Sequence, residues 1–332
     1  MRAAASAPQH TQALQVAQLY YYQGLTTSAI ADELGTSRST VSRLLTYARE
    51  NGLVEIHIHD PLAHAESIET RIRERFGLPI AKVVSVPETA GERAWLDRVA
   101  THAAGYLNTL ISADVVIGIA WGNTLRAIAE RLIPKHTVNV DVVQLNGSGT
   151  ARSIDNSIGA DIVLRFASNY NARPHSFPVP AFFDYAETRA ALWRERSVKE
   201  LIGLQRRARI MLFSIGAFSG QVPSQVHSGG FLGEADIRRL QRDGVVGDIA
   251  TVFFRADGSY EDVALNARSS GPSLRLLRRA RHSICVASGT GKVPGIRAAL
   301  RGGYINELIL DEPTARLLIE DGAPAARRAR AS

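Results

Sequence analysis

The sequence predicts an α/β protein in which an N-terminal helix-turn-helix head precedes a doubly wound, mostly parallel Rossmann-like domain. Two observations predict this architecture. Small and apolar residues between positions 26 and 52 have the spacing of two helices that cross at a tight turn. From about residue 80 onward, short β-branched runs alternate with amphipathic segments, which is typical of parallel strands connected by helices.

The composition is that of an ordinary globular chain. Of 332 residues, 45% are hydrophobic and 21% are charged, and this length is typical of two or three domains. The net charge of +7 permits a polyanionic partner, and the single Cys285 excludes an internal disulfide framework and a multi-cysteine metal site. Because there is no apolar run of about 20 residues and no secretory apolar core at the N-terminus, we expect a cytoplasmic protein with no membrane partner.

These patterns divide the chain into four expected parts. We expect a helix-turn-helix DNA-binding domain in residues 1–60, a connecting helix in 61–78, a ligand-binding effector domain in 79–322 and a disordered tail in 323–332. The connecting helix is predicted by the helical spacing of apolar residues, and the tail by its arginine-rich, solvated composition.

Three residues predict the helix-turn-helix. Ala31 is small enough to let two helices cross closely, Gly35 lies where the turn favours a positive φ, and Val41 packs the second helix onto the first. Thr36 or Ser37 is expected to cap the second helix. Residues 10–24 supply a preceding support helix.

The exposed start of the second helix is the predicted DNA contact. Its short hydroxyl side chains and arginines suit phosphate oxygens and base edges in a major groove. The predicted DNA-binding residues are Ser37, Arg38, Ser39, Thr40, Ser42 and Arg43. A plain three-helix bundle with a solvated face is the alternative, and the spacing combined with this polar exposure favours DNA binding.

The larger domain is predicted from seven strand-like runs, which are AKVVSV, ADVVIGIA, VNVDVVQL, ARIMLFSI, DIATVFF, HSICVAS and NELIL. Candidate helices between them span 91–111, 123–133, 154–169, 234–242, 291–301 and 312–319. This alternation indicates a mostly parallel sheet that is covered on both faces. Residues 170–185 are too rich in proline for a helix or a central strand, so we expect a loop over the sheet.

Residues 287–295, ASGTGKVPG, follow a predicted strand and indicate a phosphate-binding turn. A Walker loop is excluded, because it needs glycine where Val286 stands and a hydroxyl residue where Val293 stands. What remains is a turn that contains Ser288 and Gly289, followed by a helix that begins near Lys292. Backbone N–H groups and a lysine at a helix start suit a monophosphate.

Four further predicted strands also end in glycine or polar residues. Ligands bind at the carboxyl ends of parallel strands, so these ends are expected to converge on one polyhydroxy phosphate. The phosphate is assigned to Gly122, Asn123, Thr124, Ser288, Gly289 and Lys292, and the sugar hydroxyls to Asn146 and Asp248, beside Gly147 and Gly216. A plain turn is the simpler alternative for each glycine alone, whereas the combination favours a ligand site. Trp121 fits either the core or a platform for the ligand.

Together these segments resemble the SorC/DeoR-type sugar-binding transcriptional regulators. The resemblance spans about residues 12–320, and its most specific parts are WGNT, the GD pair and SGTGK with the stretch that follows it. It implies a domain like that of the sugar-phosphate isomerases and glucosamine-phosphate deaminases, a phosphorylated sugar or polyol effector, and dimers or tetramers. It also places the phosphate at Gly122, Asn123, Thr124 and Lys292, the sugar near Asn146, Gly216 and Asp248, and Pro180 in a loop that closes over the ligand.

The expected function is therefore that of a transcriptional regulator whose binding to operator DNA is controlled by a phosphorylated sugar or polyol. A sugar-phosphate isomerase or deaminase with an appended helical domain is the alternative, and a helical head that only dimerises is a third reading. The related deaminases carry a histidine directly after the turn that contains Gly216, whereas His227 is distant from it in the sequence. We therefore assign no catalytic residue, no chemistry to His227, no metal and no cofactor.

Overall fold

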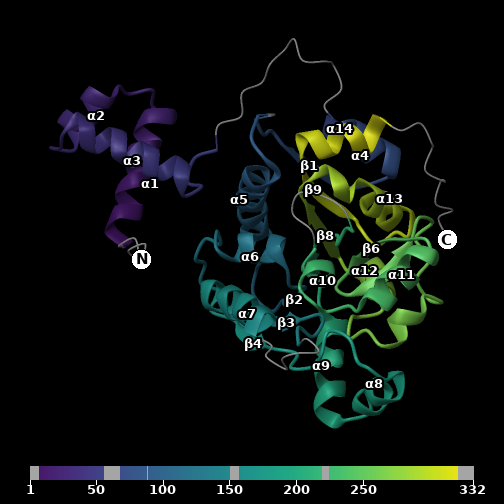
Figure 1. The fold of residues 1–332 in the computed structure, drawn as a ribbon. Helices are drawn as coiled ribbons and strands as arrows, with labels where there is room; N and C mark the ends of the chain where they lie inside the picture. Colours follow the sequence, from purple (N-terminus) through teal and green to yellow (C-terminus); the bar gives the residue numbers. More distant parts are fainter. Residues whose placement is uncertain (1–6, 56–67, 88, 150–156, 219–223, 321–332) are drawn as a thin grey trace, which may run out of the picture. The chain divides into compact units, whose positions relative to one another are not determined.

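The computed structural model describes residues 7–55, 68–87, 89–149, 157–218 and 224–320 (Figure 1). It divides the chain into two compact units, Met1–Ala65 and Glu66–Ser332. The tail expected at 323–332 and the first residues of the expected connecting helix, 61–67, lie outside the described ranges. Within those ranges, no helix combines the length and the apolar character that crossing a lipid bilayer requires.

The smaller unit contains three helices, α1 (Ala7–Tyr21), α2 (Thr27–Glu33) and α3 (Arg38–Glu50). Its core is formed by one apolar cluster, which includes the predicted contacts Ala31 and Val41. Gly35 adopts a φ of 60° in the turn between α2 and α3, a conformation that glycine adopts without steric cost. Ser37 caps α3, because its side chain accepts a hydrogen bond from the Thr40 N–H at 3.1 Å.

The larger unit is built on a seven-stranded sheet with the order β1-β9-β8-β5-β2-β3-β4. All of its strand pairs are parallel. The strands are β1 (Ile80–Val84), β2 (Val116–Ile119), β3 (Asp141–Gln144), β4 (Arg173–His175), β5 (Ile210–Phe213), β8 (His282–Ala287) and β9 (Glu307–Asp311). The doubly wound α/β class predicted from the sequence is confirmed.

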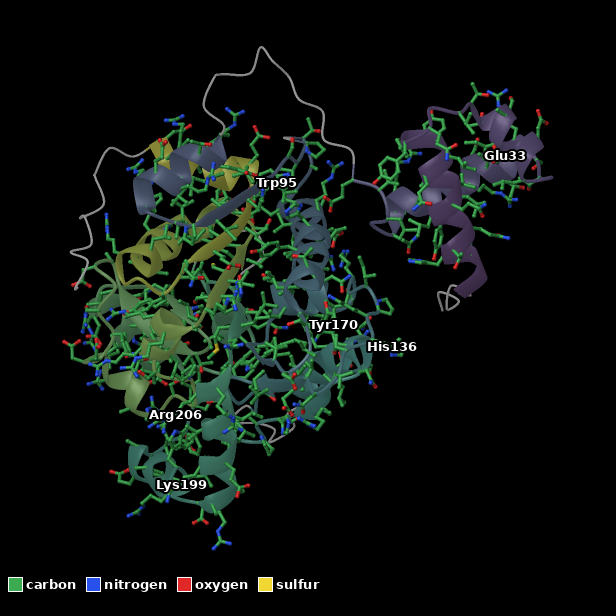
Figure 2. The ribbon with its side chains drawn as sticks, turned by 180° about the vertical axis from the view of Figure 1, so that it is seen from behind. Glu33, Trp95, His136, Tyr170, Lys199 and Arg206 are labelled. Atoms are coloured by element: carbon green, nitrogen blue, oxygen red, sulfur yellow. The ribbon has the colours of Figure 1, made fainter. Side chains whose placement is uncertain are left out.

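Both faces of this sheet are buried. In β5, Ile210 and Leu212 join one apolar cluster, whereas Met211 and Phe213 join another on the opposite face. The first cluster is covered by α5 (Glu92–Leu110), α6 (Asn123–Ala129) and α7 (Ser157–Tyr170), and the second by α4 (Ile68–Phe76), α13 (Val293–Arg301) and α14 (Glu312–Glu320) (Figure 1). Tyr170, labelled in Figure 2, is the last residue of α7 and is fully buried.

The strand order contains one reversal. From β2 the chain proceeds to β3 and β4 at one edge of the sheet, whereas from β5 it proceeds to β8 and β9 towards the other. The connections after β2 and β5 therefore diverge, and a crevice forms beyond the carboxyl ends of these two neighbouring strands.

Two predicted elements differ from the structure. The run DIATVFF was expected to be one strand of the parallel sheet, but it belongs to an antiparallel hairpin of β6 (Val245–Ile249) and β7 (Val252–Arg255). Ala250 and Thr251 form its turn at φ values of 48° and 67°. The loop expected at 170–185 contains the short strand β4, which lies at the sheet edge, where the missing N–H of Pro174 is tolerated.

Other helices complete the larger unit. They are α8 (Ala186–Leu192), α9 (Arg196–Arg207), α10 (Gln225–Ser228), α11 (Glu234–Arg242) and α12 (Arg275–Arg279), with short 3-10 turns at Ala264–Ala267 and Thr290–Lys292. Of these helices, the sequence predicted α11. Helix α4, which covers part of the expected connecting helix, belongs to the larger unit, where Arg75 donates a hydrogen bond to the carbonyl of Ile319.

Candidate functional site

A pocket lies at the crevice beyond β2 and β5, with a cavity of about 70 Å³. Its walls come from residues that follow β2, β3, β5 and β8, from the start of α5, from α10 and from the β6–β7 turn. It contains eight residues that the sequence analysis assigned to the ligand, which are Gly122, Asn123, Thr124, Asn146, Gly216, Asp248, Ser288 and Lys292. The predicted convergence of strand ends therefore occurs in the structure.

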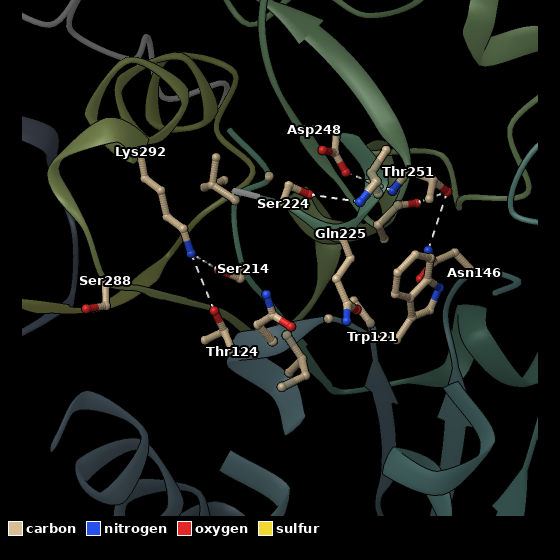
Figure 3. Close-up of a pocket in the computed structure, with 18 of the residues that line it drawn as sticks. Trp121, Thr124, Asn146, Ser214, Ser224, Gln225, Asp248, Thr251, Ser288 and Lys292 are labelled. Atoms are coloured by element: carbon tan, nitrogen blue, oxygen red, sulfur yellow. Dashed lines mark hydrogen bonds between the residues drawn. The ribbon is translucent and has the colours of Figure 1, made fainter. Parts of the chain in front are cut away.

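One side of the pocket is arranged around the ammonium group of Lys292 (Figure 3). Its Nζ lies 3.4 Å from the Thr124 hydroxyl and donates to the Ser214 hydroxyl at 3.1 Å. Burial lowers the pKa of Lys292, and the nearby Cys285, Asp311, Glu92 and Asp248 act in the opposite direction. A cation held by neutral hydroxyls, with acids at longer range, provides a place for an anionic ligand group.

The turn after β2 contributes to the same side. Gly122 adopts a φ of 136° directly before α6, a backbone conformation that favours glycine. The first helical hydrogen bond of α6 is donated by Arg126 to the Gly122 carbonyl, so the N–H groups of the first turn before Arg126 have no acceptor within the helix. The Ser288 hydroxyl, after β8, is buried without a partner among the described residues.

Gly289, predicted to bind phosphate, has a structural role instead of a place in the pocket wall. Its N–H donates to Asp311 Oδ2 at 2.9 Å. The same carboxylate accepts from the Thr314 N–H at 2.8 Å and from the Thr314 hydroxyl at 2.9 Å. Asp311 thereby fixes the turn that carries Ser288 and Lys292 to the start of α14.

The opposite side of the pocket is formed by Asn146, Asp248, Thr251 and Trp121, and Gln225 lies between the two sides (Figure 3). Asn146 Nδ2 lies 3.4 Å from the Thr251 hydroxyl, whereas its Oδ1 is buried without a partner among the described residues. The Gln225 Oε1 atom is also buried without a partner among the described residues. These two oxygens are free to accept hydrogen bonds from a ligand.

Asp248 reaches the pocket from β6, not from the end of a parallel strand as the sequence analysis assumed. It pairs with Gly216 through an isolated bridge, which joins the hairpin to the segment after β5. Its Oδ2 accepts the Thr251 N–H at 3.1 Å, and its Oδ1 has no partner in the described ranges. Burial raises the pKa of this carboxyl to about 7, against a smaller lowering by the Thr251 N–H and Lys292.

His227, to which the sequence analysis assigned no partner, lies beside this carboxyl. Its Nε2 is 3.8 Å from Asp248 Oδ1, although 21 residues separate the two in the chain. Burial lowers the pKa of His227 to about 4, so the imidazole is neutral at neutral pH and the contact is not an ion pair there. Phe218 and Phe253 surround the ring at centroid distances of 4.2 and 6.1 Å. The separation of His227 from Gly216 in the sequence therefore did not show that the imidazole lies beside Asp248, which itself pairs with Gly216.

Two further predicted sugar residues lie behind the pocket wall. The Gly147 carbonyl accepts a hydrogen bond from Trp121 Nε1 at 2.8 Å, and its N–H donates to the Ser270 hydroxyl at 3.0 Å. A Cβ atom at Gly147 would lie 2.1 Å from the Val179 carbonyl oxygen, so glycine allows this close approach. Pro180 pairs with Gly149 at the same place. These residues orient Trp121, whose ring lines the pocket.

The predicted DNA-contacting face is exposed on α3. Ser37, Arg38, Ser39, Ser42 and Arg43 are exposed, and Thr40 is partly buried. Arg38 donates to the Thr27 hydroxyl at 3.2 Å, and Arg43 donates to the Thr40 hydroxyl at 3.4 Å. The exposed face continues one and two turns further along the helix.

Several residues at these two sites were missed by the sequence analysis. Thr46 and Arg49 continue the exposed face of α3 and contact each other at 3.3 Å; their spacing from Ser42 could have shown this. Ser214 follows β5, so the strand-end argument could have found it as well. Gln225 and His227 belong to a four-residue helix that carries no such signal. The described residues contain no group of three His, Cys, Asp or Glu side chains that could hold a metal ion.

The fold and the pocket define a ligand-binding α/β protein with a helix-turn-helix unit. Residues 60–320 match the family described as "Putative sugar-binding domain", and residues 11–51 match the family described as "Sigma-70, region 4". The first match covers more than half of the chain. The chain therefore belongs to the sugar-binding transcriptional regulators, as the resemblance in its motifs predicted.

Individual relatives agree with this assignment. A deoxyribonucleoside regulator of Bacillus subtilis (strain 168) is 35% identical over 93% of this chain and 97% of the relative. The structure of a domain of a possible sugar-binding transcriptional regulator from Arthrobacter aurescens TC1 is 44% identical with a TM-score of 0.73, covering 79% of this chain and all of that one. The full-length sorbitol operon regulator SorC from Klebsiella pneumoniae is 28% identical with a TM-score of 0.68, covering 95% of this chain and all of that one.

These relatives are regulators of transcription. The chain is accordingly a DNA-binding, sugar-responsive regulator, and the prediction that it is not an enzyme is confirmed by its family.

Proposed function

We propose that this regulator responds to a phosphorylated sugar or polyol, which binds in the pocket and controls the binding of α3 to operator DNA. The contacts of the Lys292 ammonium group are the main support for this proposal. Its partly buried ammonium contacts two neutral hydroxyls, at Thr124 and Ser214, and its Nζ forms no ion pair with a carboxylate in the described ranges. A phosphate oxygen would complete the coordination of this cation, and the unpaired Ser288 hydroxyl would donate to the same group.

The polar side of the pocket supports a polyhydroxylated ligand. Asn146 and Asp248 offer buried acceptors that sugar hydroxyls can satisfy, and Trp121 offers an aromatic face to the carbon skeleton. Trp121 is held in place by its hydrogen bond to Gly147 and by the ring of Phe231 at 5.0 Å. The names of the relatives, a deoxyribonucleoside regulator and a sorbitol operon regulator, are in line with a sugar or a polyol.

On the DNA side, we propose that the exposed start of α3 enters the major groove. Arg38 and Arg43 would contact phosphates or base edges, and Ser39 and Ser42 would contact the same strand. The Ser37 cap fixes the first turn of the helix, so the hydroxyl of Ser37 is engaged within the protein.

We also propose that the regulator works as a dimer or a tetramer. Two helix-turn-helix units spaced by one helical turn of DNA read a pseudo-palindromic operator, and a ligand that changes their spacing changes the affinity for DNA. The molar mass by light scattering tests this directly, and a monomeric mass for both the free protein and the operator complex would contradict it.

The phosphate assignment is tested by Lys292→Met, which removes the charge and retains a side chain of similar length. A charge-assisted contact contributes roughly 1.5–3 kcal/mol, so the variant should lose about ten- to a hundredfold in affinity for a phosphorylated ligand. The loss for the unphosphorylated sugar should be small. Calorimetric titration of ribose 5-phosphate with ribose, and of glucitol 6-phosphate with glucitol, measures both.

Lys199→Met is the matched control, because Lys199 is exposed on α9 (Figure 2). This variant should bind every ligand as the wild type does. Equal losses of affinity for the phosphorylated and the free sugar in Lys292→Met would contradict the phosphate assignment.

A further inference from the structure

Unpaired polar atoms concentrate in the pocket. Among the described residues, the buried side-chain atoms without a hydrogen-bond partner include Asn146 Oδ1, Gln225 Oε1, Asp248 Oδ1 and Ser288 Oγ, and all four residues line it. An unpaired buried polar group costs folding free energy, so folded proteins rarely retain several of them at one place without a ligand to satisfy them. Three of these four are amide or carboxyl oxygens, which can accept hydrogen bonds.

Two of the three acceptor residues are held close together by a shared neighbour, Thr251. Asn146 and Asp248 both contact Thr251, the first through its hydroxyl at 3.4 Å and the second through its N–H at 3.1 Å. Both are almost fully buried, with 1% and 3% of their surface exposed. Gln225 lies between the Asn146 side and the Lys292 side in Figure 3.

We propose that Gln225, with Asn146 and Asp248, determines specificity by requiring hydroxyl groups on the part of the effector that lies away from its phosphate. The site then takes a fully hydroxylated sugar or polyol phosphate in preference to the corresponding deoxy compound. This inference rests on the proposed function, which supplies the anchor at Lys292.

The chemistry of the three groups explains the preference. A carbonyl or carboxylate oxygen accepts a hydrogen bond from O–H or N–H, whereas the C–H of a deoxy sugar leaves the acceptor buried and unpaired. Sites built to bond a hydroxyl therefore discriminate strongly against an analogue that lacks it. The neutral amide of Gln225 can accept from one hydroxyl and donate to the next, so it suits hydroxyls on neighbouring carbons.

Gln225 is the member of this set that can be replaced with the least effect on the fold. Asn146 and Asp248 are tied to Thr251 and to the hairpin turn, whereas the side chain of Gln225 is partly buried and its Oε1 has no partner in the described ranges. Gln225→Met retains the length and the apolar stem of the side chain and removes its hydrogen-bonding groups.

The test is calorimetric titration of the full chain with matched probes. The pairs are ribose 5-phosphate with 2-deoxyribose 5-phosphate, and glucose 6-phosphate with 2-deoxyglucose 6-phosphate, together with free ribose and free 2-deoxyribose. We expect the wild type to prefer the hydroxylated member of a pair by about tenfold or more. In Gln225→Met, the preference should shrink at least about threefold, because the deoxy ligand no longer leaves this acceptor unpaired.

Gln241→Met, at an exposed glutamine on α11, is the matched control and should keep the wild-type preference. Equal affinities of the wild type for both members of every pair would overturn the inference. An unchanged preference in Gln225→Met would show that Gln225 does not determine specificity. If free and phosphorylated sugars bind equally well, the proposed phosphate anchor fails, while the hydroxyl preference is still measured by the ribose and 2-deoxyribose pair. A wild type that binds none of the probes would overturn both proposals.

Discussion

At the scale of single residues, two neighbouring side chains depart from their usual protonation for the same reason. Burial raises the pKa of Asp248 from 3.8 to about 7 and lowers that of His227 from 6.5 to about 4, because each shift favours the neutral form in an interior with few charges. Both groups are therefore mostly neutral between about pH 4 and pH 7. A neutral pair can be placed beside Lys292 and an incoming anion without adding a further buried charge.

The two shifts have opposite effects on stability. Asp248 contributes stability that is fully present below pH 3.8 and is lost as the pH rises through about 7, because the folded protein must then bury a carboxylate. His227 contributes stability that is present above pH 6.5 and is lost as the pH falls through about 4, because the folded protein must then bury an imidazolium. In the wild type these two dependences oppose each other between pH 4 and pH 6.5.

Asp248→Asn removes the pH dependence of stability that comes from Asp248 and leaves that of His227. We predict that the free energy of unfolding of Asp248→Asn, relative to the wild type, rises between pH 4 and pH 7 by up to about 4 kcal/mol. Urea unfolding followed by tryptophan fluorescence measures this in the larger unit alone, because Trp95, Trp121 and Trp193 all lie there.

His227→Gln serves as the control for this pair, and its relative stability should change with pH in the opposite direction. If the difference between Asp248→Asn and the wild type stays flat over this range, the carboxyl does not titrate near neutral pH in the folded protein.

The pocket residues show how far the sequence predicts single positions. Thr124, Asn146 and Lys292 were found because each follows a strand of a parallel sheet, and topology alone brings such positions together. Gln225 was missed because it reaches the pocket through a short helix whose position depends on tertiary packing. The same helix places His227 beside Asp248. Gly289 was assigned to the ligand because its pattern suits a phosphate, but its N–H is used by Asp311, 22 residues away.

At the scale of elements, the β6–β7 hairpin is the feature that completes the pocket. It brings Asp248 and Thr251 over the ends of β2 and β5, and the bridge to Gly216 attaches it to the sheet. This turn could not be predicted from the sequence, since Ala250 and Thr251 occupy positions whose positive φ values usually favour glycine or asparagine. Ser269 donates to the Thr251 carbonyl at 2.7 Å and helps to hold this conformation.

Gly216→Ala tests the contact between the hairpin and the sheet. A Cβ atom at this position would lie 1.9 Å from Asp248 Oδ1 and 3.0 Å from the Ser224 hydroxyl, so the carboxylate must move. We predict a loss of about 1–3 kcal/mol in the free energy of unfolding and a loss of effector affinity of at least about tenfold. Urea unfolding and calorimetric titration measure the two effects.

Gly203→Ala on α9 is the matched control, because the added Cβ atom has room there. The nearest atom to it is Arg207 Nη1 at 3.7 Å, which is an ordinary van der Waals contact. It should be neutral or slightly stabilising, as alanine favours a helix over glycine. Retention of wild-type effector affinity in Gly216→Ala would show that the position of Asp248 does not matter for binding.

The fold itself was predicted more completely than the elements. Alternating apolar runs and amphipathic segments indicated a parallel sheet with two buried faces, and β5 shows why, since its four residues divide between two cores. The edge strand β4 was not predicted, because its proline lies in residues 170–185, which the sequence analysis interpreted as a loop. Helices α8 and α9, which follow that segment, were not predicted either. Their form depends on packing against Phe177 and Phe183 in a separate small cluster.

At the scale of the whole molecule, two compact units carry two separable activities. The helix-turn-helix unit has its own apolar core, and the pocket lies entirely within the larger unit. A variant that damages one site should therefore leave binding at the other intact, although the response of DNA binding to the effector requires both. This separation allows regulation to be distinguished from binding.

The most direct measurement is the affinity of the full chain for an operator selected from random oligonucleotides, with and without a saturating phosphorylated effector. Arg43→Ala should weaken the operator complex and keep the effector affinity of the wild type. Lys292→Met should bind the operator as the wild type does and lose its response to effector concentrations that saturate the wild type. An operator affinity that still changes in Lys292→Met, at the same effector concentrations and to the same extent, would contradict the account.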